Sequence, residues 1–549
     1  MGFASDPYLA KAAAPGTVFE IGERDGLRQF VNAPGDLSTM IESARRHGER
    51  TFLVEGERRI SYDQLFRWRD QLVPLLGIAK GDRVAICMKN RAEWMIAFLA
   101  VVRAGGVAVL FNSRGAPDEL AAMIAETEPA LVIADTDRAA RLREGGYAGR
   151  LMDITGPDVP DADAAGLPAA TEFPLMAPGD PCAILFTSGT TGRPKGAVLT
   201  HRSLITGLLS VQMSGLMILH KIADDYGMPV NQLMQQLPQQ AVLLMFPLFH
   251  ISGLGSAFLS PLLSGSKVVI MQRWDPAEAM RLIEAEKITM FSGTPTMMWD
   301  MLRAPGFAAA DLSSLTNIGI GGQASPVSLV QAVTANIPSA AMGTGYGMTE
   351  CSGSVAQSVG GDFVRKPASA GRVLPLVEMA IRGPDGADLP QGQAGEITLR
   401  GASVMAGYWN RPKETAEVLS EDGWLSTGDV GYIDDEGYVF IVDRKKDMVI
   451  SAGENIYCAE VERVITEMPG MHECATFGLP DDRLGERLVA VVRADGLDAP
   501  AICAEVADKL ASYKAPTQIA FVDAPLPRTD TGKIDKRALK ARWNELSGD

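Results

Sequence analysis

Short apolar runs alternate with helical stretches over most of the first two thirds of this chain. The runs are RVAIC, ALVIAD, CAILF, VLLMF, KVVIM and ITMFSG, and patterns such as AEWMIAFLAVVRAG lie between them. Strands buried on both faces read as continuous apolar runs, and a helix usually connects parallel strands. The alternation therefore predicts α/β layers built on buried parallel sheets.

The pattern changes beyond about Gly371. The stretches VEMAIRGPDG, GEITLRG and GYVFIVDRKKD alternate in polarity and end in Gly/Asp turns, which is typical of antiparallel strands. From Glu460 onward, two helical patterns, the runs ATFGLP and RLVAVVRA and a final basic helix form an α+β tail. Because 549 residues are too many for one core, we predict a large multi-layer α/β domain with a β-rich subdomain (1–443) and a small α+β domain (444–549).

Composition excludes several classes of protein. The formal net charge of −16 argues against general binding to nucleic acids or anionic membranes. Six cysteines without a C-x-x-C pair fit a reducing compartment, and the start of the chain has no secretory pattern. The most apolar stretch, Trp94–Phe111, is interrupted by Arg103 and two glycines, so it predicts a buried helix, turn and strand. We expect a cytoplasmic protein without a transmembrane segment.

The stretch FTSGTTGRPKG (Phe186–Gly196) combines glycines, hydroxyl side chains and one lysine. It follows the apolar strand Ala183–Phe186 and precedes a helical pattern, THRSLITGLLS, with Thr200 as the expected N-cap. Backbone N–H groups, hydroxyls and the Lys195 ammonium together suit a polyphosphate. A Walker A loop is excluded because Pro194 and Gly196 flank the lysine. The alternative is a flexible surface loop.

Six motifs in a fixed order extend this interpretation. They are TSGTTGRPKG, FPLFHISGL, GYGMTE, WLSTGDVG, DRKKDMVISAGENIY and PRTDTGKIDKRAL. Together they resemble the adenylate-forming superfamily of acyl-CoA synthetases, luciferase-like enzymes and peptide-synthetase adenylation domains, from about Ile60 to Leu539. The resemblance implies that a carboxylate attacks the α-phosphate of ATP, giving acyl-AMP and pyrophosphate, and that coenzyme A then displaces AMP. The implied cofactors are ATP, Mg²⁺ and coenzyme A, with a small carboxylic acid as substrate and a homodimer as a candidate assembly.

The resemblance also assigns residues to the nucleotide. The β- and γ-phosphates would be held by Thr187, Ser188, Gly189, Thr190, Thr191 and Lys195. The GYGMTE motif would bind adenine and phosphate through Gly345, Tyr346, Gly347, Met348 and Thr349, with the Tyr346 ring stacked on adenine. Glu350 would be the Mg²⁺ ligand, because hard cations prefer oxygen donors. The adenine and acyl pocket would be walled by Gly322, Gln323 and Ala324, and the ribose held by Asp429 and Arg444.

Several of these residues have simpler interpretations. Glu350 could face water from a turn, Asp429 could cap its own backbone, and Arg444 could be a solvated charge at a strand end. His250, in FPLFHISG, could be a packed core residue; the resemblance places it beside the carboxylate and acyl site as a gate or orienting group. Lys533 could be one more cation of a basic helix.

The resemblance gives Lys533 a catalytic role on the carboxylate and α-phosphate oxygens. The C-terminal domain would then be mobile, closing for adenylation and swinging at Lys446 so that coenzyme A can enter. Gly453, in SAGENIY, would line the pantetheine tunnel. The chain departs from the common pattern at Ala452, where glycine is usual, and at Cys458, where proline is usual.

The predicted activity is that of an ATP-dependent acyl-CoA ligase. A medium- or long-chain fatty or aryl-aliphatic acid is expected, since FPLFHISGLGSAFLSPLLSG has no tryptophan to shorten a pocket. The alternatives are an acyl-AMP ligase that loads a carrier protein, a luciferase-like oxygenase and a non-catalytic ATP-binding regulator. The Met217–Gln240 stretch could be an extended helix with a loop, or an insertion covering a pocket.

Overall fold

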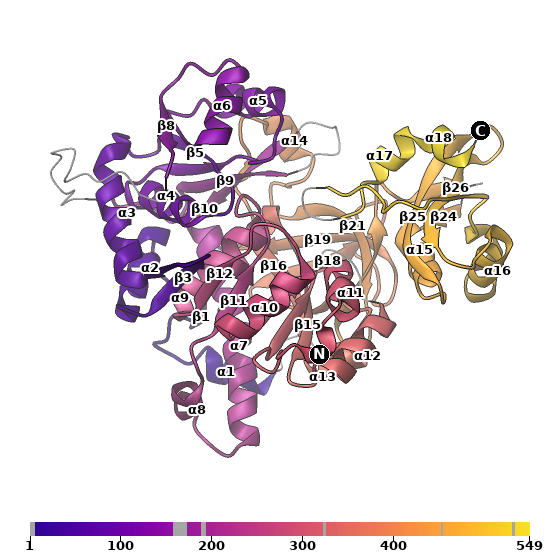
Figure 1. Ribbon diagram of the computed structural model, residues 1–549, viewed down its shortest axis with the longest axis horizontal. Helices are drawn as coiled ribbons and strands as arrows, with labels where there is room; N and C mark the ends of the chain where they lie inside the picture. Colours follow the sequence, from indigo (N-terminus) through magenta and orange to yellow (C-terminus); the bar gives the residue numbers. More distant parts are fainter. Residues whose placement is uncertain are drawn as a thin grey trace.

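The computed structural model describes residues 6–156, 173–187, 194–321, 326–451, 454–529 and 533–548. Figure 1 shows a large body, and the last hundred or so residues as a separate lobe beside it. Two extended sheets form the body, and a third sheet forms the lobe. The predicted class, α/β with a β-rich part and an α+β tail, is confirmed.

The first sheet has seven strands, and its centre is parallel. The apolar runs predicted as strands are here: all four residues of β6 and all five of β7 are buried. The parallel pairs are β9–β6, β6–β5, β5–β7 and β7–β8, whereas β10 and β20 add antiparallel pairs at one edge. In order across the sheet, the strands are β20 (Gly407–Tyr408), β10 (Lys195–Thr200), β9 (Pro181–Thr187), β6 (Val107–Leu110), β5 (Arg83–Cys87), β7 (Leu131–Asp135) and β8 (Leu151–Ile154).

The second sheet has thirteen strands, antiparallel from β18 to β16 and mostly parallel from β15 to β4. The change of direction occurs between β15 and β16, so the predicted β-rich subdomain continues the parallel sheet. The strands in order are β18 (Val377–Arg382), β19 (Gly395–Gly401), β21 (Leu425–Ile433), β22 (Tyr438–Arg444), β17 (Gly371–Val373), β16 (Gly353–Val359), β15 (Ala341–Met348), β14 (Asn317–Ile320), β13 (Met290–Gly293), β11 (Ala241–Leu244), β12 (Lys267–Ile270), β3 (Thr51–Glu55) and β4 (Arg58–Ser61). A separate hairpin joins β1 (Ile21–Arg24) and β2 (Leu27–Phe30).

Helices separate and cover these two sheets. One core lies between them and contains α4 (Ala92–Arg103), which is buried from Ala92 to Val102 as the apolar stretch predicted. The same layer holds α2 (Leu37–Glu42), α3 (Tyr62–Leu76), α7 (His201–Asp225) and α9 (Ser260–Ser264). The outer face of the first sheet packs on α5 (Pro117–Thr127) and α6 (Thr136–Glu144). The outer face of the second packs on α10 (Pro276–Glu286), α11 (Pro295–Arg303), α12 (Val327–Asn336) and α13 (Gly361–Arg365).

The C-terminal lobe has its own five-stranded sheet with a core on each face. Its strands are β24 (Glu454–Ile456), β23 (Val449–Ser451), β26 (Gly485–Ala494), β25 (Met471–Asp481) and β27 (Gln518–Phe521). One core packs on α15 (Cys458–Thr466) and α16 (Ala499–Lys509), and the other on α17 (Lys536–Ala541) and α18 (Trp543–Ser547). β22 of the large body ends at Arg444, and β23 of the lobe begins at Val449.

Thr200 caps α7 as predicted, but the segment before it differs from the prediction. The Thr200 hydroxyl accepts the Ser203 N–H at 3.0 Å, and the Ser203 hydroxyl accepts the Thr200 N–H at 3.0 Å. Sequence analysis identified no strand between the glycine-rich loop and this helix, and the structure has one there, β10. All six residues of Lys195–Thr200 are buried in β10, because Gly-Ala-Val-Leu pairs with β9 as the returning arm of a hairpin.

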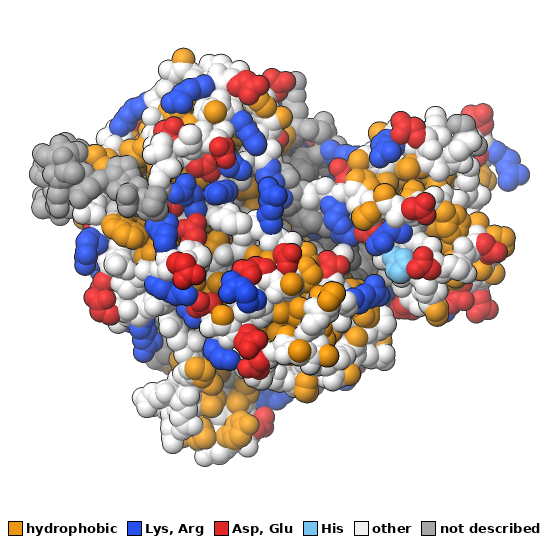
Figure 2. Space-filling view, in the orientation of Figure 1, with side chains coloured by type: hydrophobic (Ala, Val, Ile, Leu, Met, Phe, Trp, Pro, Cys, Tyr) orange, Lys and Arg blue, Asp and Glu red, His pale blue; other side chains and the backbone are white. Residues whose placement is uncertain are grey.

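The Met217–Gln240 stretch continues α7 and ends in a loop with α8 (Val230–Gln236), as an extended helix with a loop would. By length and composition alone, α7 could cross a membrane, and no other helix in the described ranges could; 61% of its most apolar window is buried in protein, as in core helices. Beyond Asp225 the chain carries no charged residue until after Gln240, and Tyr226 and Met234 are exposed. Figure 2 shows mostly hydrophobic and uncharged side chains at this end of the molecule. α1 (Pro7–Ala12) lies beside α7, where Lys11 pairs with Asp224 at 2.5 Å.

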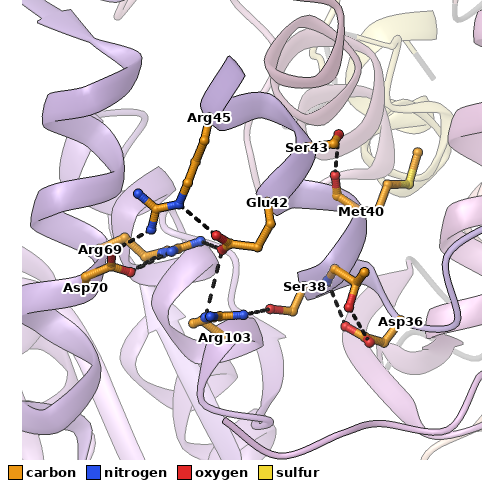
Figure 3. Close-up of polar contacts among 10 residues, drawn as sticks. Asp36, Ser38, Met40, Glu42, Ser43, Arg45, Arg69, Asp70 and Arg103 are labelled. Carbon is orange, nitrogen blue, oxygen red and sulfur yellow. Dashed lines mark hydrogen bonds and ion pairs between the residues drawn. The ribbon is translucent and has the colours of Figure 1, made fainter. Parts of the chain in front are cut away.

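A buried ion network joins α2, α3 and α4 (Figure 3). Arg69 is 1% exposed, donates to Glu42 and pairs with Asp70 at 2.5 Å. Arg45 reaches the same two carboxylates at 2.7 and 2.6 Å. Burial opposes ionisation of Glu42, but the hydrogen bonds from Arg69 and Arg45 outweigh it and hold the Glu42 pKa below its usual value.

Replacing Arg69 with methionine should destabilise the protein by about 3 kcal/mol, because it leaves a partly buried carboxylate without its main cation. Denaturant unfolding of Arg69→Met beside Arg67→Met, an exposed arginine of the same helix, measures the loss. Equal free energies of unfolding for the two variants would mean that the ion network does not stabilise the fold.

Candidate active site

The lysine of the glycine-rich motif lies at the start of β10. Its partner across the hairpin is Thr187, the last residue of β9, whose hydroxyl donates to the Lys195 carbonyl at 3.4 Å. Lys195 is only 8% exposed, which is unusual for a lysine. It forms no salt bridge with any residue of the described segments; instead its ammonium lies 5.1 Å from the centre of the Tyr408 ring.

A buried carboxylate lies on the other side of Tyr408. Glu350 belongs to the short helix η5 (Thr349–Cys351), is 6% exposed, and accepts a hydrogen bond from the Tyr408 hydroxyl at 2.8 Å. The Thr187 side chain also bonds to it. Burial raises the pKa of Glu350 in spite of these donors and of the more distant Arg444 charge.

The GYGMTE motif forms β15 and the tight turn into β16. A side chain at Gly347 would meet the Gly353 carbonyl oxygen at 2.0 Å, so only glycine allows the two strands to approach. Ser352 adopts a positive φ of 56°, and its N–H donates to the Thr349 carbonyl at 2.9 Å, which closes the turn. Gly345, Tyr346, Gly347 and Met348 lie along β15, with Gly345 and Gly347 exposed and Tyr346 and Met348 half-buried. The turn thus carries Thr349 and Glu350 away from the sheet.

Three predicted ribose and adenine residues meet beside this turn. The Tyr346 hydroxyl donates to Asp429 Oδ2 at 2.7 Å, and Arg444 Nε lies 3.5 Å from Asp429 Oδ1. The last two residues face each other in the β21–β22 register. The pKa of Tyr346 is raised well above its usual value by burial and by the Asp429 charge. Asp429 is thus held between a phenol and a guanidinium, with free acceptor capacity for a sugar diol.

Lys533 comes from the C-terminal lobe and lies within electrostatic reach of the same cluster. Its carbonyl accepts the Thr529 N–H at 2.7 Å, and α17 follows it, with Asp535 as the N-cap. The side chain is accessible to solvent, yet partial desolvation by surrounding protein atoms lowers the pKa of its ammonium. The Arg444 charge lowers this pKa further, whereas the Asp429 charge raises it. Lys533 of the lobe therefore lies within electrostatic reach of the predicted ribose residues of the large body.

Lys446 lies in the turn between the two parts of the molecule. The N–H groups of Asp447 and Met448 both donate to the Arg444 carbonyl, at 2.9 and 3.1 Å. Burial and the neighbouring Arg444 charge lower the pKa of Lys446. Asp443, in β22 of the large body, contacts the lobe: its carboxylate accepts the Ala459 N–H of α15 at 3.1 Å.

His250 lies in the loop between β11 and the helix η3 (Ser252–Leu259). Its ring is half-buried and 4.5 Å from that of Phe249, and its carbonyl accepts the Leu254 N–H at 2.9 Å. The next residue, Ile251, lies 4.0 Å from the position that a side chain at Gly353 would occupy, so His250 adjoins the Glu350 turn.

The candidate site residues that the structure describes therefore form two groups, and β15 and η5 connect them. Thr187, Lys195, Thr349 and Glu350 form one, and Tyr346, Asp429, Arg444 and Lys533 the other. Ser188, Gly189, Thr190, Thr191, Gly322, Gln323, Ala324 and Gly453 lie outside the described residues. Sequence analysis did not single out Tyr408, because its contacts depend on pairing between β10 and β20, which no local pattern reveals.

Glu350 and its neighbour Thr187, in the first group, have the oxygen donors that a hard divalent cation prefers. Glu350 is buried and, among the residues described, has no lysine, arginine or histidine in a salt bridge with it. Its carboxylate and the adjacent Thr187 hydroxyl supply oxygen donors, which Mg²⁺ prefers. A cation here would offset the cost of a buried, unpaired anion.

Comparisons with known proteins agree with this arrangement. The AMP-binding enzyme family matches residues 40–409, and the AMP-binding enzyme C-terminal domain matches residues 460–533. A feruloyl-CoA synthase of Amycolatopsis is 35% identical over 511 residues, covering 92% of this chain and 98% of its own. The long-chain-fatty-acid–CoA ligase FadD13 of Mycobacterium tuberculosis is 34% identical, covering 85% and 90%. The crystal structure of ATP-bound MatB from Rhodopseudomonas palustris has a TM-score of 0.79 at 28% identity, covering 92% and 99%.

Proposed function

The chain belongs to the AMP-binding enzyme family, and from this membership we propose that it is an ATP-dependent acyl-CoA ligase for a sizeable apolar acid. The acid would be a medium- or long-chain fatty acid or an aryl-aliphatic acid. The observation that carries the proposal is that Lys533, from the C-terminal lobe, lies within electrostatic reach of Asp429 and Arg444 of the large body, which pair with each other at 3.5 Å. A lysine of one folding unit that lies near candidate nucleotide-binding residues of another is better placed to neutralise phosphate charge than to stabilise either unit.

In the first step, a carboxylate oxygen of the acid attacks the α-phosphorus of ATP, and the bond to the bridging oxygen breaks to release pyrophosphate. Asp429 and Arg444 would hold the ribose, with the Tyr346 ring against adenine. Lys195 would neutralise the leaving phosphates, and Lys533 would neutralise charge on the carboxylate and α-phosphate oxygens. Mg²⁺, when bound at Glu350, would supply further charge neutralisation on the phosphates.

In the second step, the sulfur of coenzyme A attacks the acyl carbon, and the bond between that carbon and the AMP oxygen breaks. The C-terminal lobe would turn at Lys446, withdrawing Lys533 and bringing the segment near Gly453 to the acyl site. The Asp443 carboxylate, which accepts the Ala459 N–H at 3.1 Å, is a contact between the large body and the lobe that such a turn would have to break.

The acid class is inferred from relatives and from the local sequence. The relatives' names include an aryl acid and a long-chain fatty acid. In this chain, η3 follows His250 with buried Leu254, Phe258 and Leu259 and without tryptophan. A cytoplasmic enzyme is proposed, since none of its six cysteines is paired, with a homodimer as its candidate assembly.

Pyrophosphate release across a panel of carboxylic acids, with and without coenzyme A, tests this proposal. We expect release with medium- to long-chain or aryl-aliphatic acids, little with acetate, and acyl-CoA only when coenzyme A is present. Release that never yields acyl-CoA would favour an enzyme that loads a carrier protein. ATP binding without any release would favour a non-catalytic regulator, and light emission with oxygen uptake a luciferase-like enzyme.

Replacing Asp429 with alanine should raise the KM for ATP at least about tenfold, because hydrogen bonds from the ribose to a charged acceptor are lost. Asp429→Asn, which keeps one acceptor, should fall between this variant and the wild type. Steady-state kinetics at saturating acid measure the change, and Asp435→Ala, at the exposed far end of the same hairpin, is the control. If the KM for ATP did not move, Asp429 would lie outside the nucleotide site.

A further inference from the structure

The segment around Tyr408 is fixed by backbone hydrogen bonds to β10 and to the turn that carries Glu350. Tyr408 pairs with Ala197 in the β10–β20 register, and its neighbours donate to β10, from Ala406 to Val198 at 2.9 Å and from Trp409 to Gly196 at 2.8 Å. On the other side, the Met405 N–H donates to the Glu350 carbonyl at 2.8 Å. The segment therefore ties the strand that carries Lys195 to the turn that carries Glu350.

The ring of Tyr408 contacts the charge of Lys195, and its hydroxyl contacts the charge of Glu350. The Lys195 ammonium lies 5.1 Å from its ring centre, a distance at which the negative face of the ring attracts a cation. The hydroxyl donates to the Glu350 carboxylate at 2.8 Å. The Tyr408 N–H donates to the Thr415 hydroxyl at 2.9 Å, so the backbone of this residue is also held from α14 (Pro412–Ala416).

Two buried opposite charges on neighbouring elements would otherwise attract each other strongly. Lys195 and Glu350 are 8% and 6% exposed, and neither forms a salt bridge with another described residue. A direct Lys195–Glu350 pair would occupy the ammonium needed for phosphate and the carboxylate needed for a cation. The ring face leaves the Lys195 ammonium available to a phosphate, and the phenol leaves the Glu350 carboxylate available to a cation.

We propose that Tyr408 is a positioning residue that keeps Lys195 and Glu350 apart and available for the triphosphate. This inference rests on the proposed function, because it takes the two charges to be the phosphate-side groups of an ATP site. Tyr408→Phe would remove the hydroxyl that holds the carboxylate and let Glu350 turn to Lys195. Tyr408→Leu would remove the ring face as well.

A double-mutant cycle on metal-free ATP binding tests the proposal. The dissociation constant would be measured by calorimetry in EDTA, without acid or coenzyme A, for wild type, Tyr408→Phe, Glu350→Gln and the double variant. Tyr408→Phe should weaken ATP binding about tenfold in the wild-type background but less than about twofold beside Glu350→Gln, where no carboxylate can pair with Lys195. Tyr408→Leu should weaken binding in both backgrounds, and Tyr513→Phe, exposed in the C-terminal lobe, should change neither.

Equal weakening by Tyr408→Phe in the two backgrounds would overturn the proposal, because a purely structural role does not depend on the Glu350 charge. No weakening in either background would overturn it too. With MgATP, the same variant should raise KM more than it lowers kcat. A wild-type protein that bound neither ATP nor MgATP would instead contradict the proposed function, so the two failures are distinguishable. Tyr408→Phe is a deletion of one oxygen, and a thermal melt beside the wild type checks that it folds.

Discussion

Replacing Lys533 with alanine is expected to reduce acyl-adenylate formation at least about 100-fold, the scale of losing one donor that stabilises charge in the transition state. Thioester formation from supplied acyl-AMP should be nearly unchanged, because the first step has already been completed. The reason lies in its placement: Lys533 lies within electrostatic reach of Asp429 and Arg444, whereas Lys536 of the following helix α17 pairs with Glu462 of the lobe itself at 2.7 Å. Pyrophosphate release and acyl-CoA formation from acyl-AMP measure the two half-reactions separately.

Lys540→Ala is the matched control, since Lys540 is an exposed cation of the neighbouring helix α17. It should leave both half-reactions unchanged. If Lys533→Ala slowed the two half-reactions equally, the claim that Lys533 acts in adenylation and not in thioester formation would be contradicted.

Replacing Lys446 with proline should slow thioester formation far more than adenylation, by about tenfold or more. Proline fixes φ near −65° and restricts the residue before it, so the turn that leads from Arg444 to Asp447 could no longer rearrange freely. Unlike the Lys533 change, this one leaves the charges of Lys195, Asp429 and Lys533 in place; it removes the Lys446 ammonium and restricts the backbone at the turn. The same two half-reaction assays measure it.

Lys446→Ala separates the side chain from the backbone. It removes the ammonium but keeps rotation about φ, so it should retain most of the thioester step. If the proline and alanine variants behaved alike, with similar melting temperatures, Lys446 would not be the hinge.

The sequence allowed a good prediction of the layers but not of how they join. Apolar runs such as Val107–Leu110 predicted buried parallel strands because burial on both faces leaves a continuous apolar signal. β10 was missed because its partner, β9, is antiparallel and the glycine-rich loop between them looked like a strand-to-helix connection. The merging of the parallel and antiparallel halves at β15–β16 is a long-range pairing that no local window contains.

For the site, the motifs predicted residue types, and the fold supplied their partners. The sequence resemblance indicated Tyr346, Asp429 and Glu350, and the AMP-binding enzyme family it implied is confirmed, as is the class of AMP-forming acid–thiol ligases. The Tyr346–Asp429 hydrogen bond joins residues 83 positions apart, and the Tyr408–Glu350 bond joins residues 58 apart. Such contacts follow from sheet order, so Tyr408 could not be found before the strands were placed.

Oxygen transfer from the acid to AMP tests the central claim most directly. If the carboxylate attacks the α-phosphorus and the thiol later attacks the acyl carbon, one carboxylate oxygen must leave with AMP. A turnover with acid labelled by ¹⁸O in its carboxylate, analysed by mass spectrometry, should therefore give AMP that carries one heavy oxygen and unlabelled pyrophosphate. Label in inorganic phosphate with ADP as the product, or AMP without any label, would contradict an acyl-adenylate intermediate.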